Sequence, residues 1–569
     1  MSFLKKASLL TIPTAYKQGK LYSVKPDDGS GDFTFTRSTS ATRVNEAGLI
    51  EKARENLLLA SNNFSDATYW NNQGSLTSGQ AGYDGTNNAW LFQNSTTGTG
   101  IYQSFTTSGV QTFSVYVKKD ATYGIRFFTL GSATVDTFFN LNTGNVVYAN
   151  ANTIEAKIEA YNTDWWRISV TFDESLTRIY LYPTNNGTAN AVGSYTIQDA
   201  QLEAGLVATD YIETTTSTVS TGIVENVPRI DYSSGTPSLL LEPQRTNLIN
   251  YSDYFDATEW NNPNNTRDCI ITKTNDINPA GEASAYSYEA TGSSNQIAYL
   301  NSLSTGTTIT NSIYVKRVTG TGNVILRDVN NALYNFSLTV ADGWKRIDTT
   351  EVLNSSNVRF YLNLQTIGDK ILIWGAQQEE GSYATSYIPT YGTSVTRTDE
   401  KTNILDLGIT GQDVTHFVEL DNNVELIRDS GAADIKWSEG GGAYLGSVRI
   451  FRAGSNLRRF DINLIDTNGT FPFSLISINT DNAKVAIKRI WATGEIKVFV
   501  NGVLELSATS TNYTTWNHLE LQGVGDMINV KSLLSFPTAL TDADCEILTG
   551  EAYSSFEAMA NSLNYTIYE

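Results

Sequence analysis

Short runs in which apolar and polar residues alternate recur along most of the chain, separated by clusters of Asn, Gly, Ser and Thr. Residues 112–118 and 359–364 are typical runs. In each of them about every second side chain is apolar, so one face of the segment would be buried and the other would not. Runs of four to eight such residues between turn-forming clusters predict β-strands. The pattern therefore predicts an all-β chain of sandwiches.

Four groups of residues occur twice in the same order, which predicts two homologous jelly-roll domains at residues 54–214 and 245–400, joined by a linker at 215–244. The groups are Arg54, Asn56, Leu57 and Trp70, matched by Arg245, Asn247, Leu248 and Trp260; Ser114 to Lys118, matched by Ser312 to Lys316; Trp166 and Arg167, matched by Trp344 and Arg346; and Ala200, Gln201, Glu203 and Tyr211, matched by Ala376, Gln377, Glu379 and Tyr387. The offset between the copies changes along the chain, and we expect loops alone to explain the change. The repeats resemble carbohydrate-binding-module-like jelly rolls.

Past Arg397 the repeat stops, and residues 401–569 form a different domain. Asn501-Gly502 lies between two alternating runs, and both residue types tolerate the positive φ of a type I′ turn, so we expect a hairpin there. A Trp-containing run at 516–521 and a Leu-Thr-Asp-Ala segment at 540–543 follow. This order resembles the concanavalin A-like and laminin-G-like sandwich, a fold that serves lectins, adhesion modules and glycanases.

Residues 1–53 form an N-terminal segment and linker of different character. The stretch 1–26 contains five lysines and no acid, whereas the whole chain has a net charge of −20. Two interpretations remain open: the segment folds back onto the first jelly roll, or it docks on an acidic surface of another protein and adds little to the stability of the sandwiches. The side chains predicted to anchor it are Phe3, Leu4, Leu9, Ile12, Tyr16 and Tyr22.

Composition narrows the possible partners. The excess of acid would repel a phosphate backbone, so we expect no nucleic-acid partner. No apolar stretch approaches the length that spans a bilayer, so we expect no membrane insertion. The two cysteines, Cys269 and Cys545, lie in different predicted domains and suggest no disulfide framework.

The sequence offers little material for catalysis. Only His416 and His518 are available for triads or histidine metal sites, and no nucleophile elbow, zinc or phosphate-loop motif occurs. Carboxylates such as Glu379, Glu380 and Glu439 could pair for glycoside hydrolysis, but a chain with 59 acidic residues contains such candidates by coincidence. We therefore expect no enzyme and no cofactor, and the sequence leaves bound metal undecided.

Aromatic side chains suit sugar binding, because an aromatic ring can pack on the apolar face of a sugar. Trp165 is a candidate because its neighbour Trp166 must point to the opposite face of the sheet. Trp437 and Tyr444 are candidates because they flank a glycine-rich segment. Trp166, Trp344 and Trp516 are predicted instead to lie in domain cores.

The segments at about residues 1–60 and 221–249 resemble structural proteins of tailed bacteriophages, crAss-like phages among them. The resemblance implies a head or tail fibre, or a similar appendage, on the surface of the virion. Expected partners are other capsid or tail proteins, further copies of the chain in a homo-oligomer, most often a trimer, and glycans of the host surface or the environment. The alternative is a secreted bacterial protein that binds or degrades polysaccharide.

Overall fold

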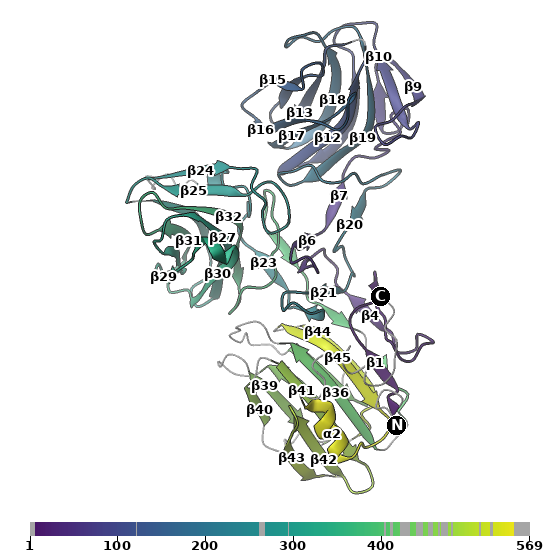
Figure 1. Cartoon of the computed structure of the whole chain (residues 1–569), viewed down its shortest axis with the longest axis vertical. Coiled ribbons are helices and arrows are strands. Elements are labelled where there is room, and N and C mark those ends of the chain that lie inside the picture. The colour runs from purple at the N-terminus through teal and green to yellow at the C-terminus, as the bar shows by residue number, and fades with distance from the viewer. Residues whose placement is uncertain are drawn as a thin grey trace.

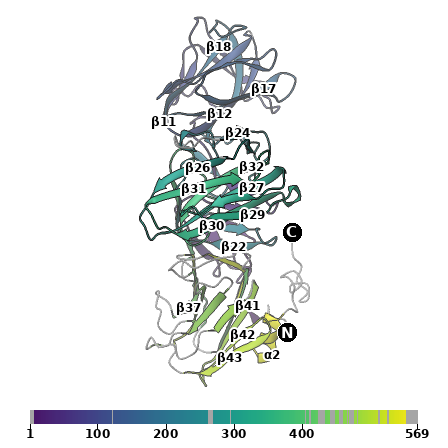
Figure 2. The same cartoon turned by 90° about the vertical axis from the view of Figure 1, so that its left-hand side faces the viewer.

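Nearly all the regular secondary structure of the computed structural model is β-strand, which confirms the predicted all-β fold class of two jelly rolls and a further sandwich. The three units follow one another along the long axis of the molecule (Figures 1 and 2). The structure describes residues 6–550 apart from 121, 261–267, 294, 403–404, 410–412, 422–432, 440–447, 453–458, 465–466, 468–475, 480–481, 511–513 and 524–526. Within these residues, no helix is long and apolar enough to cross a lipid bilayer.

The first jelly roll consists of two antiparallel six-stranded sheets around one core. The sheets have the orders β16-β17-β12-β19-β10-β9 and β15-β14-β13-β18-β11-β8. Alternation in β12 sends Phe113, Val115 and Val117 into the core, as the pattern at 112–118 predicts. The strands are β8 (Trp70–Asn72), β9 (Ser75–Gln80), β10 (Ala89–Gln93), β11 (Ile101–Thr107), β12 (Val110–Lys119), β13 (Gly124–Gly131), β14 (Asp136–Asn140), β15 (Asn145–Ala149), β16 (Thr153–Ala160), β17 (Trp165–Asp173), β18 (Leu176–Thr184) and β19 (Ser194–Ala204).

The second jelly roll has a five-stranded sheet of order β24-β25-β32-β27-β30 and a four-stranded sheet of order β26-β31-β28-β29. Its elements are the 3₁₀ helix η1 (Thr258–Trp260), β24 (Cys269–Lys273), β25 (Tyr286–Ala290), β26 (Gln296–Ser302), β27 (Thr308–Thr319), β28 (Val324–Arg327), β29 (Leu333–Phe336), the 3₁₀ helix η2 (Val340–Asp342), β30 (Trp344–Val352), β31 (Asn357–Leu364) and β32 (Lys370–Glu380).

The two jelly rolls share one strand order. Strands β9, β10, β19, β12 and β17 are neighbours in the first, and β24, β25, β32, β27 and β30 are their counterparts in the second. The last strand of each carries the same buried hydrogen bond, from Gln201 Nε2 to Glu203 Oε1 and from Gln377 Nε2 to Glu379 Oε1, each 2.7 Å long. Glu379, one of the carboxylates considered for hydrolysis, is thus fully buried and bonded to Gln377 of its own strand.

The copies differ in strands as well as in loops. Their offset along the sequence is smaller at Trp166 and Trp344 than at Tyr116 and Tyr314, so the first copy has the longer intervening segment. That segment contains β15 and β16, which have no counterpart among the described strands of the second jelly roll. The expectation that loops alone differ is therefore wrong. The extra residues add one edge strand to each sheet, β15 beside β14 and β16 beside β17, and leave the central strands unchanged.

The C-terminal sandwich is assembled from three separate stretches of the chain. One sheet has the order β21-β22-β45-β36-β41-β42-β43, with β1 also paired to β45, and the other has the order β2-β3-β4-β34-β44-β37-β38-β39-β40, with β35 also paired to β44. Between β42 and β43, Asn501 and Gly502 have φ of 48° and 84°, which confirms the predicted hairpin. The elements are β1 (Leu9–Thr11), β2 (Tyr16–Lys17), β3 (Lys20–Leu21), β4 (Phe33–Thr36), β21 (Arg229–Asp231), β22 (Ser238–Leu241), β34 (Lys401–Thr402), β35 (Leu405–Asp406), β36 (Val414–Asp421), β37 (Ala433–Ser438), β38 (Val448–Arg452), β39 (Arg459–Leu464), β40 (Ile476–Asn479), β41 (Asn482–Ile490), β42 (Glu495–Val500), β43 (Val503–Thr509), β44 (His518–Gly523), β45 (Ile528–Phe536) and α2 (Asp542–Thr549).

The N-terminal segment belongs to this sandwich. Strand β1 pairs with β45, so Leu9 enters the sandwich core and Ile12 packs in the cluster that contains residues of α2. The pairing covers an open edge of β45 and buries apolar surface at the same time. Leu9 and Ile12 are therefore not available to a partner protein, contrary to the prediction, and the segment does not fold onto the first jelly roll either. Tyr16 and Tyr22 are partly exposed, and Phe3 and Leu4 lie outside the described residues.

Each jelly roll is connected to this sandwich through a two-stranded ribbon. Strand β7 (Arg54–Asn56) pairs with β20 (Val219–Thr221) below the first, and β23 (Arg245–Asn247), which lies beside the second in Figure 1, pairs with β33 (Val395–Arg397). A short hairpin of β5 (Thr42–Val44) and β6 (Ile50–Lys52) precedes the first ribbon. Both jelly rolls are thus inserted into one unit, the C-terminal sandwich with its N-terminal and linker strands, which we call the base.

A buried network of five charges lies where the ribbons leave the base. Glu400 Oε1 accepts hydrogen bonds from Arg37 Nη1 at 2.6 Å and Arg229 Nε at 2.8 Å. Glu242 Oε2 lies 2.7 Å from Arg229 Nη1 and 2.8 Å from Arg397 Nη1. Burial alone would raise the pKa of Glu242, but the charges of Arg397 and Arg229 lower it to about 2. The network therefore joins the N-terminal segment, the linker and the start of the C-terminal stretch.

Candidate ligand-binding site

Trp165, predicted to carry an exposed ring, is only 3% exposed. It packs with Tyr116 on the outer face of its sheet, where the ring of Tyr83 stacks on that of Tyr116 with centroids 3.6 Å apart. Trp166, predicted to be a core residue, is the partly exposed one of the pair, and Trp344 is partly exposed as well. Neighbouring side chains do alternate, but this outer face has an aromatic layer of its own that buries Trp165. The prediction of an exposed ring is wrong.

Trp437 is also buried, contrary to the prediction. It is 1% exposed in the core of the base, and its ring stacks on that of His416 with centroids 5.0 Å apart. The reason is that Trp437 belongs to strand β37, which lies between β38 and β44 and directs this side chain inward. Trp516 is 2% exposed in the same core, as predicted. Tyr444 lies outside the described residues.

The histidines are engaged in structural contacts. His416 is fully buried, with Nδ1 3.0 Å from Ser535 Oγ and Nε2 3.0 Å from the carbonyl oxygen of Trp516. Burial lowers the pKa of His416 to about 3, so its ring is neutral near pH 7. His518 Nδ1 lies 2.9 Å from Asn517 Oδ1. Over the described part of the chain, no three His, Cys, Asp or Glu side chains are grouped so that they could hold a metal ion.

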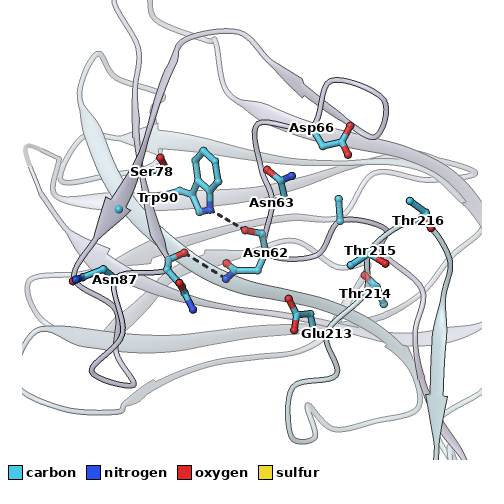
Figure 3. A pocket seen from close by; sticks show the side chains of 13 residues that line it. Asn62, Asn63, Asp66, Ser78, Asn87, Trp90, Glu213, Thr214, Thr215 and Thr216 are labelled. Carbon is cyan, nitrogen blue, oxygen red and sulfur yellow. Dashed lines mark hydrogen bonds between the residues drawn. The ribbon is translucent and has the colours of Figure 1, made fainter.

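The first jelly roll has a pocket of about 350 Å³ that sequence reasoning missed. Its walls come from the chain before β8, the β9–β10 region and the segment after β19, so residues far apart in sequence meet there (Figure 3). Polar side chains predominate, and one large aromatic ring, that of Trp90, is present. The lining residues are Ala60, Asn62, Asn63, Asp66, Ser78, Gly79, Asn87, Asn88, Trp90, Glu213, Thr214, Thr215 and Thr216.

Asn62 fixes the shape of this pocket. Its carbonyl oxygen accepts a hydrogen bond from Trp90 Nε1 at 2.8 Å, and its Nδ2 donates to the carbonyl oxygen of Asn88 at 3.4 Å. Its Oδ1 accepts from the backbone N–H of Asp199 at 3.1 Å. In the view of Figure 3, Asn62 lies between Trp90 and Glu213. The indole orientation is thus set by the backbone, which leaves the partly exposed ring as a fixed wall.

The pocket has an acidic character. Asp66 and Glu213 contribute carboxylates, and none of the described residues that line it is Lys or Arg. Asp199 lies directly behind Asn62, where burial raises its pKa to about 6 and Tyr83 Oη donates to its Oδ2 at 2.7 Å. A site of amides, hydroxyls and carboxylates beside one aromatic ring can hydrogen-bond a polyhydroxylated ligand and pack against its apolar face.

Trp90 is not shared by the two copies of the repeat. The equivalent position of the second jelly roll holds Tyr286, which is fully buried. The change from tryptophan to tyrosine at one position of the repeat, after the Asn87-Asn88 pair, is the signal that a sequence comparison of the copies could have used.

No family model and no curated protein matches the chain. Among solved structures, the CBM40 of Ruminococcus gnavus IT-sialidase bound to α2,3-sialyllactose matches with 15% identity and a TM-score of 0.19, over 24% of this chain and 83% of that one. The tandem CBM22-1–CBM22-2 of Paenibacillus barcinonensis Xyn10C matches with 12% identity and a TM-score of 0.20, over 57% and 98%. A leech intramolecular trans-sialidase matches with 15% identity and a TM-score of 0.20, over 26% and 27%. With identities and TM-scores this low, these likenesses carry no functional argument.

Proposed function

We propose that the protein is an adhesive binding protein whose first jelly roll binds a sugar in the pocket beside Trp90. The observation that carries the proposal is a partly exposed indole, held by its own hydrogen bond to Asn62, within a ring of amide, hydroxyl and carboxylate groups. The sugar ring would pack on the indole, and the exposed side chains of Asn87, Thr215 and Thr216, together with Asn63, would bond its hydroxyls. The chain would bind its ligand without cleaving it.

We further propose that the chain is an appendage on the surface of a tailed-bacteriophage virion. Its architecture supports this role: the base combines both ends of the described chain, and the two jelly rolls extend from it on ribbons (Figure 1). The base would attach to capsid or tail proteins, and several copies of the chain, as a trimer, would present their pockets together. Several weak sites on one particle would then bind a glycan-covered surface firmly, because linked sites bind at a high effective concentration.

The binding proposal predicts that Trp90→Ala weakens sugar binding by about 5- to 150-fold, which corresponds to about 1 to 3 kcal/mol for losing one aromatic wall. The measurement is a glycan array followed by titration calorimetry of the best binder with the full chain. Trp491→Ala is the matched control, because Trp491 is 42% exposed on the base, away from the pocket, and should leave binding unchanged. Equal binding by Trp90→Ala and the parent chain would refute the site.

A further inference from the structure

The second jelly roll has a position equivalent to the pocket of the first. Trp90 in β10 lies opposite Ile197 in β19, and Tyr286 in β25 lies opposite Ile373 in β32. The two isoleucines have the same offset along the sequence as the repeated Ala-Gln pair in these strands. Trp90 and Tyr286 are therefore equivalent.

Two further pairs define the same position. Asn62 corresponds to Asp253, since each follows a serine whose Oγ lies 2.6 Å from a tyrosine Oη; the serine–tyrosine pairs are Ser61 with Tyr211 and Ser252 with Tyr387. Thr215 corresponds to Tyr391, again with the offset of the Ala-Gln pair. The pocket of the first jelly roll thus has a counterpart bounded by Asp253, Tyr286 and Tyr391.

In the second jelly roll an ammonium group of the chain itself binds at this position. Lys52, at the end of β6, places Nζ 2.9 Å from Glu282 Oε2 and 3.0 Å from Tyr391 Oη. Glu282 belongs to the β24–β25 loop, the counterpart of the β9–β10 loop that carries Asn87 and Asn88. Burial alone would lower the pKa of Lys52, but the charge of Glu282 raises it, so the buried amine stays protonated.

The equivalent pocket of the first jelly roll is also lined by carboxylates, but among its described lining residues no cationic side chain pairs with them. Asp66 and Glu213 line its pocket, and no Lys or Arg is found among the described lining residues. Asp66 Oδ1 already accepts the backbone N–H of Thr68 at 3.0 Å, so Glu213, whose side chain is exposed, is the carboxylate better placed to meet a ligand. A cationic group on the ligand would restore the charge balance that Lys52 provides in the second copy.

We propose that the ligand of the first jelly roll is an amino sugar with a free, protonated amine, whose ring packs on Trp90 and whose ammonium group pairs with Glu213. The inference rests on the proposed sugar-binding function and adds the chemical class of the sugar. A glucosamine unit of a deacetylated polysaccharide has this chemistry, whereas its N-acetylated form and a neutral glucan do not.

Titration calorimetry of the full chain with three trisaccharides tests the inference: one of glucosamine, one of N-acetylglucosamine and one of glucose. We expect the glucosamine trisaccharide to bind about tenfold tighter than the other two, the scale of one charge-assisted hydrogen bond. Glu213→Gln should remove this preference and leave binding of the neutral sugars unchanged. Glu159→Gln, which removes the same charge from another exposed position of the same jelly roll, should keep it.

The outcomes separate the two proposals. Equal binding of all three sugars, abolished by Trp90→Ala, would overturn the amine preference and keep the sugar site. Binding of none of them would overturn the amine preference, and absence of any binder on the glycan array as well would overturn the sugar site. Binding of a lysine tripeptide as tightly as the glucosamine trisaccharide would show that the pocket recognises an amine without a sugar, and would also overturn the inference.

Discussion

Replacing Glu400 with glutamine should lower the free energy of unfolding of the base by about 3 to 5 kcal/mol, the cost of breaking a buried ion pair from one side. Glu400 is fully buried and lies between Arg37 and Arg229. Glutamine keeps the shape but leaves three buried arginines with Glu242 as the only remaining carboxylate of the network. For a unit of this size we expect its melting transition in calorimetry to fall by roughly 6 to 20 °C.

The neighbouring Asp399 provides the matched control. Its Oδ2 lies 2.7 Å from Lys401 Nζ, but the lysine side chain is 48% exposed. A pair so exposed to solvent contributes about 0 to 1 kcal/mol, so Asp399→Asn should shift the same transition little. Equal shifts for both variants would contradict the role assigned to the buried network.

Deleting residues 1–26 should abolish the unfolding transition of the base and leave the transitions of the two jelly rolls in place. The deletion removes β1, β2 and β3 together with four buried aliphatic side chains, Leu9, Leu10, Ile12 and Leu21. Each such side chain contributes about 2 to 5 kcal/mol, and together they exceed the stability of an ordinary domain. The sequence alone predicts that residues 1–26 add little to the stability of the sandwiches, because it does not reveal that β1 is a strand of the base.

Point substitutions keep this prediction testable if the truncated chain does not fold. Leu9→Ala should destabilise the base by about 2 to 5 kcal/mol, because Leu9 is 2% exposed in its core. Val24→Ala should change its stability by less than about 0.5 kcal/mol, because Val24 is 49% exposed. A base that melts normally in the Leu9→Ala variant would show that β1 adds nothing to the sandwich.

Local patterns in the sequence were sufficient for the fold class and the repeat. Alternation at 112–118 predicts β12 because side chains of a strand point to opposite faces, and Asn501-Gly502 predicts the β42–β43 turn because both residues reach positive φ. The repeated Gln201 and Gln377 mark equivalent last strands because each makes the same buried hydrogen bond.

Features that depend on distant parts of the chain were not predictable in this way. Strand β1 pairs with β45, which lies close to the other end of the described chain, and nothing in the local pattern of Leu9 identifies that partner. Alternation correctly separates Trp165 from Trp166, yet only the structure reveals that Tyr83 and Tyr116 cover one of the two faces. The pocket at Trp90 depends on three segments that meet only in the folded jelly roll.

Selective ¹⁵N labelling of the ten tryptophans tests the sugar site most directly, since Trp90 Nε1–H donates to Asn62 inside the pocket. Each indole N–H gives one NMR signal, which Trp→Phe variants assign. On titration with the sugar that binds best, we expect the Trp90 signal to shift with saturation while the signal of Trp491 stays in place. A saturating shift of other indoles with Trp90 unmoved, or no shift of any indole, would contradict the assignment of sugar binding to the first jelly roll.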